Sequence, residues 1–267
     1  MNATPNTLWT VVGYQLRDAV KSRWLLQHTL IYLLVAEGLL LAGGSGERAL
    51  VSLVNVVLLL VPLGALVFGT MHLYNARDFI LLLLTQPVER KSLFGGIYLG
   101  LAIPESLGLI VGLVTPFALH GKLSAGVAIE LAVLTGLAVL LTCIFTALAL
   151  LIATHAKDRV RCIGIALGVW LAMAIVYDGM VLLAVNALAE FPIEKPLMAL
   201  MMVNPVDLAR VLLLNLFDAQ ALMGYTGAVF ARFFASPMGF TLVAFSLTAW
   251  LLVPFVLTRR AFARKDF

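Results

Sequence analysis

Residues 77–92 read Arg-Asp-Phe-Ile-Leu-Leu-Leu-Leu-Thr-Gln-Pro-Val-Glu-Arg-Lys-Ser and lie between two uncharged apolar runs, each long enough to cross a bilayer. Charges at both ends and a proline near the middle predict that this stretch lies at the membrane surface. Its centre, Phe79 to Leu84, is apolar on all sides and needs a partner to bury it. Asp78 suits the first turn of a helix, and Pro87 would end that helix. The stretch predicts either a tight turn or a short docking helix.

The composition of the 267-residue chain excludes a water-soluble domain. Hydrophobic residues make up 62% of it and charged residues 12%. Apolar runs of about 20 residues are typical of transmembrane helices. The sequence therefore predicts an all-α integral membrane protein with six transmembrane helices, at about residues 24–42, 50–74, 93–119, 126–153, 162–188 and 239–258.

We expect residues 1–267 to form a single transmembrane domain. Apolar residues at helical spacing, flanked by Trp9, Tyr14 and Trp24, predict an amphipathic helix at the N-terminus that lies in the headgroup layer. Three segments are expected outside the membrane core: residues 1–23 as this cytoplasmic helix, residues 75–92 as a cytoplasmic loop and residues 189–238 as an outer loop with short helices.

The basic residues predict the orientation of the spans. Thirteen of the 18 Lys and Arg residues fall on the side of the N-terminus and five on the other side. Short cytoplasmic loops carry the excess of basic residues, so both termini are expected in the cytoplasm. The net charge of +4 does not indicate nucleic-acid binding, because the basic residues are spread over short loops instead of forming one stripe.

Four acidic residues fall within the predicted spans: Glu37, Glu105, Glu130 and Asp178. A charge in the bilayer core is costly, so such a residue normally faces protein or water. Glu37 and Glu130 lie near the outer ends of their spans and can reach the interface. Glu105 and Asp178 lie deeper, which predicts a place in helix packing or along a transport pathway. Because no basic residue falls in a span, we expect these acids to be protonated, hydrogen-bonded to polar neighbours or in contact with water.

The outer loop contains a helix start at Asn204-Pro-Val-Asp207. Asparagine is a good N-cap, proline suits the first helical position, and an acid favours the first turn. Asp207, Arg210 and Asp218 then fall on one arc of the helix. We therefore predict a short re-entrant or interfacial helix whose polar arc faces water or an outer partner protein.

The sequence contains no motif for catalysis, nucleotide binding or metal binding. The Gly121-Lys122 pair is followed by Leu and lacks the pattern of a phosphate-binding loop. Cys143 and Cys162 stand apart from each other and from any histidine at ligand spacing, so we expect free thiols. Methionines of the outer loop could bind copper through their thioethers, but they fit helix packing as well. We expect no catalytic residue, cofactor or metal site in this chain.

Two stretches resemble the ABC-2 type permeases, the membrane subunits of one class of ATP-driven transporters. Residues 77–90 are similar to the loop after the second span of that family, and residues 15–24 to the helix before its first span. In the family this loop is a coupling helix that fits a groove on the ATPase subunit. The resemblance implies an ATPase-coupling role for Arg77, Asp78, Phe79, Leu82, Leu83, Gln86, Pro87 and Arg90.

The resemblance also implies a homodimer in the lipid of the bacterial inner membrane, with ATP and Mg bound by a separate ATPase subunit. Residues 204–210 and 224–230 resemble the family members that support nitrous-oxide reductase maturation. This implies a role in copper-site assembly together with a periplasmic maturation protein, which Asp207, Arg210 and Asp218 would contact. The alternatives are an exporter of lipid, drug or polysaccharide, a proton-driven secondary transporter using Glu105 or Asp178, and a membrane anchor without transport.

Overall fold

The structure, a computed structural model, describes residues 6–21, 23–85, 89–156, 158–187, 194–217 and 236–264. Within these residues all regular secondary structure is helical, which confirms the predicted fold class. In chain order the helices are α1 (Asn6–Lys21), α2 (Arg23–Gly43), α3 (Gly46–Asn75), α4 (Arg77–Leu84), α5 (Arg90–Leu119), α6 (Ala125–His155), α7 (Arg159–Leu171), the π-helical segment η1 (Ala172–Val176), α8 (Tyr177–Ala187), α9 (Glu194–Val203), α10 (Pro205–Leu216) and α12 (Pro237–Arg264).

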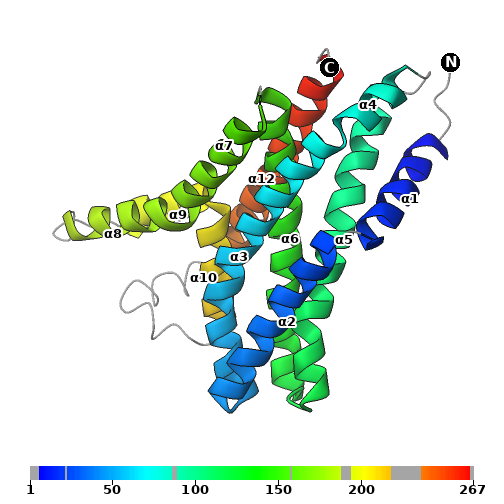
Figure 1. Cartoon of the computed structure of the whole chain (residues 1–267). Coiled ribbons are helices and arrows are strands. Elements are labelled where there is room, and N and C mark those ends of the chain that lie inside the picture. The colour runs from blue at the N-terminus through cyan, green and yellow to red at the C-terminus, as the bar shows by residue number, and fades with distance from the viewer. Residues whose placement is uncertain are drawn as a thin grey trace.

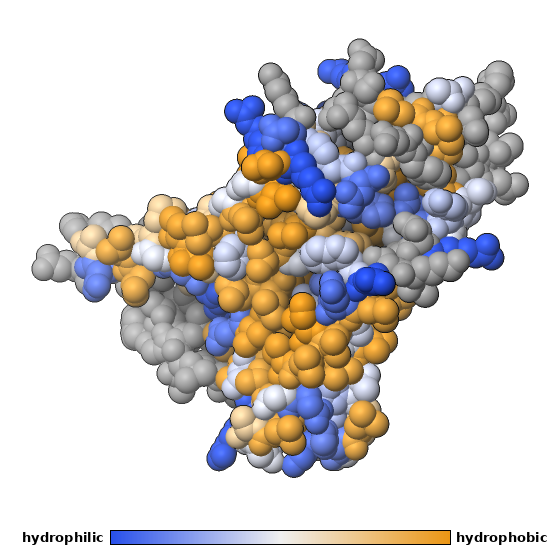
Figure 2. Space-filling view, in the orientation of Figure 1, coloured by the Kyte–Doolittle hydropathy of each residue, from blue (hydrophilic) through white to orange (hydrophobic). Residues whose placement is uncertain are grey.

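Six helical runs in the described part of the chain are long and apolar enough to cross a membrane. They are α2, α3, α5, α6, the run from α7 through η1 into α8, and α12, and they match the predicted spans to within a few residues. The α2–α3 and α5–α6 turns lie at the lower end of the bundle, whereas α4, the α6–α7 turn and the last turn of α12 lie at the upper end (Figure 1). The middle of the visible surface is largely apolar, and hydrophilic residues gather toward both ends (Figure 2).

Side-chain caps define where several helices begin. The backbone N–H of Val127 donates to Ser124 Oγ (3.4 Å) at the start of α6, and that of Arg161 donates to Asp158 Oδ1 (2.7 Å) at the start of α7. These oxygens satisfy N–H groups that have no partner within the helix. The two caps therefore fix the short turns that separate α5 from α6 and α6 from α7.

Three helices, α3, α5 and α6, form the centre of the bundle. The buried share of their most apolar windows is 50%, 61% and 56%, against 17 or 18% in the other three spans. Small residues let the central backbones approach closely. A Cβ atom added at Gly69 of α3 would lie 2.7 Å from the Cβ of Ala149 in α6, and one at Gly112 of α5 would lie 2.7 Å from the Cβ of Tyr32 in α2. The remaining spans surround this centre and keep broad apolar faces exposed.

The predicted N-terminal amphipathic helix is α1, and it packs against the bundle. Val12 and Gln15 are buried, and a Cβ atom added at Gly100 of α5 would lie 2.3 Å from the Cβ of Gln15. The side chain of Gln15 hydrogen-bonds to His72 of α3 (Oε1 to Nε2, 3.0 Å). Trp9 is 66% exposed, on the side that remains for the membrane interface. One face of α1 thus belongs to the protein core.

Candidate functional site

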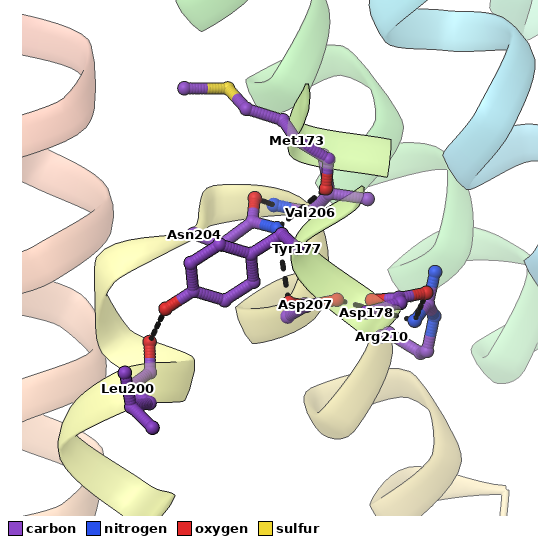
Figure 3. A network of polar contacts seen from close by, with 8 residues as sticks. All are labelled: Met173, Tyr177, Asp178, Leu200, Asn204, Val206, Asp207 and Arg210. Carbon is purple, nitrogen blue, oxygen red and sulfur yellow. Dashed lines mark hydrogen bonds and ion pairs between the residues drawn. The ribbon is translucent and has the colours of Figure 1, made fainter. Parts of the chain in front are cut away.

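A network of polar contacts joins the fifth span to the helices that follow it (Figure 3). We call it the α8–α10 network. Its members come from η1 and α8 on one side and from α9 and α10 on the other. They are Met173, Tyr177, Asp178, Leu200, Asn204, Val206, Asp207 and Arg210.

Asn204 makes three contacts within this network. Its Oδ1 accepts a hydrogen bond from the backbone N–H of Val206 (3.1 Å), which caps α10 as the sequence predicts. Its Nδ2 donates to the carbonyl oxygen of Met173 (2.7 Å) and to Asp207 Oδ2 (3.0 Å). One buried amide therefore fixes the start of α10, orients the Asp207 carboxylate and attaches both to the fifth span.

Arg210 is shared between two carboxylates. Its Nη1 donates to Asp178 Oδ2 (2.6 Å) and to Asp207 Oδ1 (3.2 Å). Asp207 is 4% exposed, whereas the side chains of Asp178 and Arg210 are 37% and 26% exposed. Charge-assisted hydrogen bonds are the stronger class, and a low local dielectric strengthens them further. The arrangement places one guanidinium against two acids from different helices.

The backbone of the fifth span is irregular next to these residues. The π-helical segment η1 ends immediately before Tyr177 and Asp178, and such segments are frequent at functional sites. The hydroxyl of Tyr177 donates to the carbonyl oxygen of Leu200 in α9. Three residues of the fifth span, Met173, Tyr177 and Asp178, thus contact α9, α10 and the residue between them over a short length of helix.

These positions correct one expectation and refine another. Of the predicted polar arc of α10, Asp207 is turned toward the protein, where it is buried and contacts Asn204 and Arg210, whereas Arg210 remains partly exposed. The acids of the spans were expected to have no basic partner, but Arg210 pairs with Asp178. The expectation failed because the basic partner comes from α10, a helix outside the six spans that packs against them. Asp218 lies outside the described residues.

Glu105 lies in a separate place, between α5 and α6. Its side chain is 1% exposed, and its Oε2 accepts a hydrogen bond from the hydroxyl of Thr146 (2.9 Å). Its Oε1 is buried and has no hydrogen-bond partner within the described part of the chain. The residue is therefore enclosed between α5 and α6, and its predicted role, in helix packing or along a transport pathway, stays a prediction.

The two acids expected near the outer ends of their spans lie there. Glu37 Oε1 is 2.6 Å from His120 Nε2, and both side chains are partly exposed. The neighbouring Lys122 donates to the carbonyl oxygen of Gly44 (3.0 Å), so polar contacts join the α2–α3 turn to the α5–α6 region. Glu130 is half-buried in the second turn of α6.

The stretch between the second and third spans contains a helix, α4, with an inward and an outward side. Ile80 is fully buried and Leu83 is half-buried against the same apolar cluster of the protein. Leu82 is 60% exposed and Leu81 is 36% exposed. Leu83 belongs to the predicted coupling residues, but its side chain packs partly on the chain itself. The remaining coupling residues of this stretch lie outside what the structure describes, either as side chains or entirely: Arg77, Asp78, Phe79, Gln86 and Pro87.

Arg90, the last residue of the predicted coupling set, joins two spans. Its Nη1 donates to the carbonyl oxygen of Ala263 (3.3 Å), in the last turn of α12. The carbonyl groups of a helix C-terminus lack partners within the helix and favour a cation. Arg90 therefore holds the start of α5 against the end of α12 beside α4.

The two cysteines lie apart from each other in the described part of the chain. Neither Cys143 nor Cys162 takes part in a disulfide bond there. No group of three or more His, Cys, Asp or Glu residues stands close enough there to hold a metal ion. Met201 and Met202 are half-buried and pack against the apolar core, which agrees with the packing role that the sequence left open.

The sequence points to the polar residues Asp178, Asn204, Asp207 and Arg210 but not to their pairing. It places Asp178 in a span and Arg210 in the outer loop. A signal was present, because an acid in a span and a base in an apolar segment both need a partner. The roles of Tyr177 and of the Met173 carbonyl group had no sequence signal, since they depend on the path of the backbone.

Comparison with known proteins agrees with the helical architecture. The model of a family described as ABC-2 family transporter protein matches residues 9–267. A relative from Pseudomonas aeruginosa, described as probable ABC transporter permease protein NosY, is 29% identical over 236 residues, covering 81% of this chain and 85% of the relative. A relative from Stutzerimonas stutzeri with the same description is 27% identical over 279 residues, covering 97% of this chain and 99% of the relative.

Proposed function

The chain belongs to the ABC-2 transporter family and is the permease component of an ABC transporter, and on this premise we propose that it works as a homodimer driven by a separate ATPase chain. ATP and Mg would bind to that ATPase chain. The observation that carries the proposal is the exposed apolar side of α4, at the turn between the second and third spans.

The two sides of α4 suit a coupling element. On the inward side, Ile80 and Leu83 pack against the bundle, so α4 is fixed to the spans. On the outward side, Leu82 and Leu81 present apolar surface that a groove on another protein can bury. A helix held in this way would pass a movement of the docked subunit to the spans as a rigid-body shift.

We further propose that α4 and both termini lie in the cytoplasm and that the membrane is the bacterial inner membrane. The described basic residues support this orientation. Arg159 and Arg161 begin α7, and Arg259, Arg260 and Arg264 lie near the end of α12. These segments lie at the same end of the bundle as α4 (Figure 1). Cytoplasmic loops carry the excess of basic residues in membrane proteins.

We propose that this transporter supports the assembly of the copper sites of nitrous-oxide reductase, together with a periplasmic maturation protein. The support is the name of both relatives, NosY, and the resemblance of residues 204–210 and 224–230 to permeases of that system. The permease would either move a substrate or transmit force to the outer partner.

Affinity purification of the tagged chain from native membranes in mild detergent tests the proposal. We expect an ABC ATPase chain to co-purify, as identified by mass spectrometry. Leu82→Ala should reduce that co-purification, because truncation of a buried anchor typically costs about 2 kcal/mol, or roughly thirtyfold in affinity. Leu119→Ala is the matched control, since Leu119 is 78% exposed at the opposite end of the bundle. Purification without any ATPase would contradict the proposal.

A further inference from the structure

The fifth span and α10 are held in the protein in different ways. Eight of the twelve residues of α10 are buried, and its apolar side chains pack in the core cluster that includes α3 and α6. In the described part of the fifth span, by contrast, the buried residues are Cys162, Ala166 and Ala174. None of these three lies in α8, where every described side chain is half-buried or exposed. The outer half of this span therefore has few apolar contacts, made by partly buried residues such as Val181, and the polar contacts of the α8–α10 network add to its attachment.

We propose that Asp178, Asn204 and Arg210 are positioning residues that fasten the outer half of the fifth span to α10, so that both move as one unit. This inference rests on the proposed function for its purpose, which is to carry an ATP-driven movement of the spans to the outer segment. Such coupling requires a contiguous physical connection between the moving parts.

The π-helical segment explains why the contacts can all face α10. Met173 and Asp178 are five residues apart, which would separate them by about 140° around a regular α-helix. One additional residue in a turn, the effect of a π-segment, removes about 100° of this offset. Met173 and Asp178 then reach the same partner helix through Asn204 Nδ2 (2.7 Å) and Arg210 Nη1 (2.6 Å). The irregular backbone is thus part of the attachment.

The network is buried on the α10 side, where Asn204 and Asp207 are 2% and 4% exposed. The Asp178–Arg210 pair is partly exposed, with side chains 37% and 26% exposed, so solvent screens it. Removing the Asp178 charge alone should therefore shift the ratio of attached to detached α8 by up to roughly fivefold. The buried packing of α10 should be unaffected.

Spin-label distance measurements on the full chain test this directly. Labels are placed at Leu182 of α8 and Leu216 of α10, both exposed, after Cys143 and Cys162 are replaced by Ala. Labelled chain is mixed with excess unlabelled chain, so that distances between copies do not contribute. We expect one narrow distance distribution in the parent and a second, longer population in Asp178→Asn.

Asp158→Asn is the matched control, because it makes the same change in the same helical run at its cytoplasmic end. Asn also caps helices well, so this variant should keep the narrow distribution. A narrow distribution in Asp178→Asn would overturn the proposal. Equal broadening in both variants would overturn it too, since the effect would then be general loosening of the fifth span.

A second measurement tests the common movement. In the complex with the ATPase, a non-hydrolysable ATP analogue should change the distance from Leu182 to a label at Leu119 of α5, while the Leu182–Leu216 distance stays constant. A change in the Leu182–Leu216 distance would overturn the proposal. The first measurement needs no ATPase, so failure of co-purification contradicts the proposed function alone.

Discussion

At the scale of single residues, Glu105 is held in the centre of the bundle by one hydrogen bond. The donor, Thr146, is fully buried on α6, and the distance to Glu105 Oε2 is 2.9 Å. A buried polar group that loses its partner keeps its full desolvation cost. The contact should therefore matter more for stability than its single bond suggests.

We predict that Thr146→Val lowers the thermal midpoint of the purified permease, because it removes the hydrogen-bond donor to Glu105 at a cost of about 1–3 kcal/mol. Thr142→Val is the control on the same helix: Thr142 is also buried, but its hydroxyl donates to the carbonyl oxygen of Ala138 in its own helix (2.9 Å). Differential scanning fluorimetry of both variants is the measurement. Equal thermal midpoints for the two variants would show that the Glu105 contact stabilises the permease no more than the Thr142 hydrogen bond does.

The sequence predicts that Glu105 and Asp178 avoid lipid, because a charge in a bilayer is costly. It does not predict which residue each one meets. The partner of Glu105 is 41 positions away on α6, and the partner of Asp178 is 32 positions away on α10. Such pairings depend on how the helices pack, and helical periodicity gives only the face on which a residue lies.

At the scale of elements, α4 shows what an apolar stretch leaves undecided. The charges at its start and the proline after it allow either a tight turn or a short helix at this place, and the structure has the helix α4 there. Four consecutive leucines follow Ile80, so the sequence cannot indicate which side faces the protein. The burial of Ile80 in the apolar cluster that also contains Leu93 and Phe94 decides it.

We predict different effects on the stability of the permease for two neighbouring truncations in α4. Ile80→Ala should destabilise the permease itself, by about 2–5 kcal/mol, because it leaves a cavity in the apolar cluster. Leu82→Ala should change the stability of the isolated permease by less than about 0.5 kcal/mol, as is usual for exposed positions. Thermal unfolding of each purified variant without ATPase distinguishes them. Equal loss of stability would mean that Leu82 also packs on its own chain.

The helix start at Asn204 was predictable because an N-cap, a proline and a first-turn acid coincide there. The π-helical segment was not, since Ala172 to Val176 has the composition of ordinary transmembrane helix. The difference is that a cap is a hydrogen bond between residues close in the sequence, so the residue types alone predict it. The π-turn has no such local cap, and the side chain that contacts it, Asn204 on the carbonyl oxygen of Met173, comes from a distant part of the chain.

At the scale of the whole molecule, six spans place the α2–α3 and α5–α6 turns at one end and α4 and the α6–α7 turn at the other (Figure 1). Together with the excess of basic residues near α4, this arrangement predicts that the first pair of turns lies outside the cytoplasm. The length of the apolar runs was enough to predict the six spans, because the thickness of the bilayer sets the length of a span, whereas the orientation stays a prediction from charge.

Cysteine accessibility in intact spheroplasts measures this orientation. In a background without native cysteines, Leu123→Cys should react with a membrane-impermeant maleimide added from outside, whereas Glu89→Cys should react after permeabilisation. Both side chains are exposed, so differences in burial do not explain the outcome. Reaction of both residues from the same side would contradict the six-span orientation.

The central claim is that two copies of this chain and a separate ATPase form one ATP-driven transporter. Native mass spectrometry of the complex, extracted gently from its own membrane, tests it most directly. The account predicts an assembly with two copies of this chain and two copies of an ABC ATPase, which loses the ATPase when Leu82 is replaced by Ala. An assembly that contains this chain without any ATPase would contradict it.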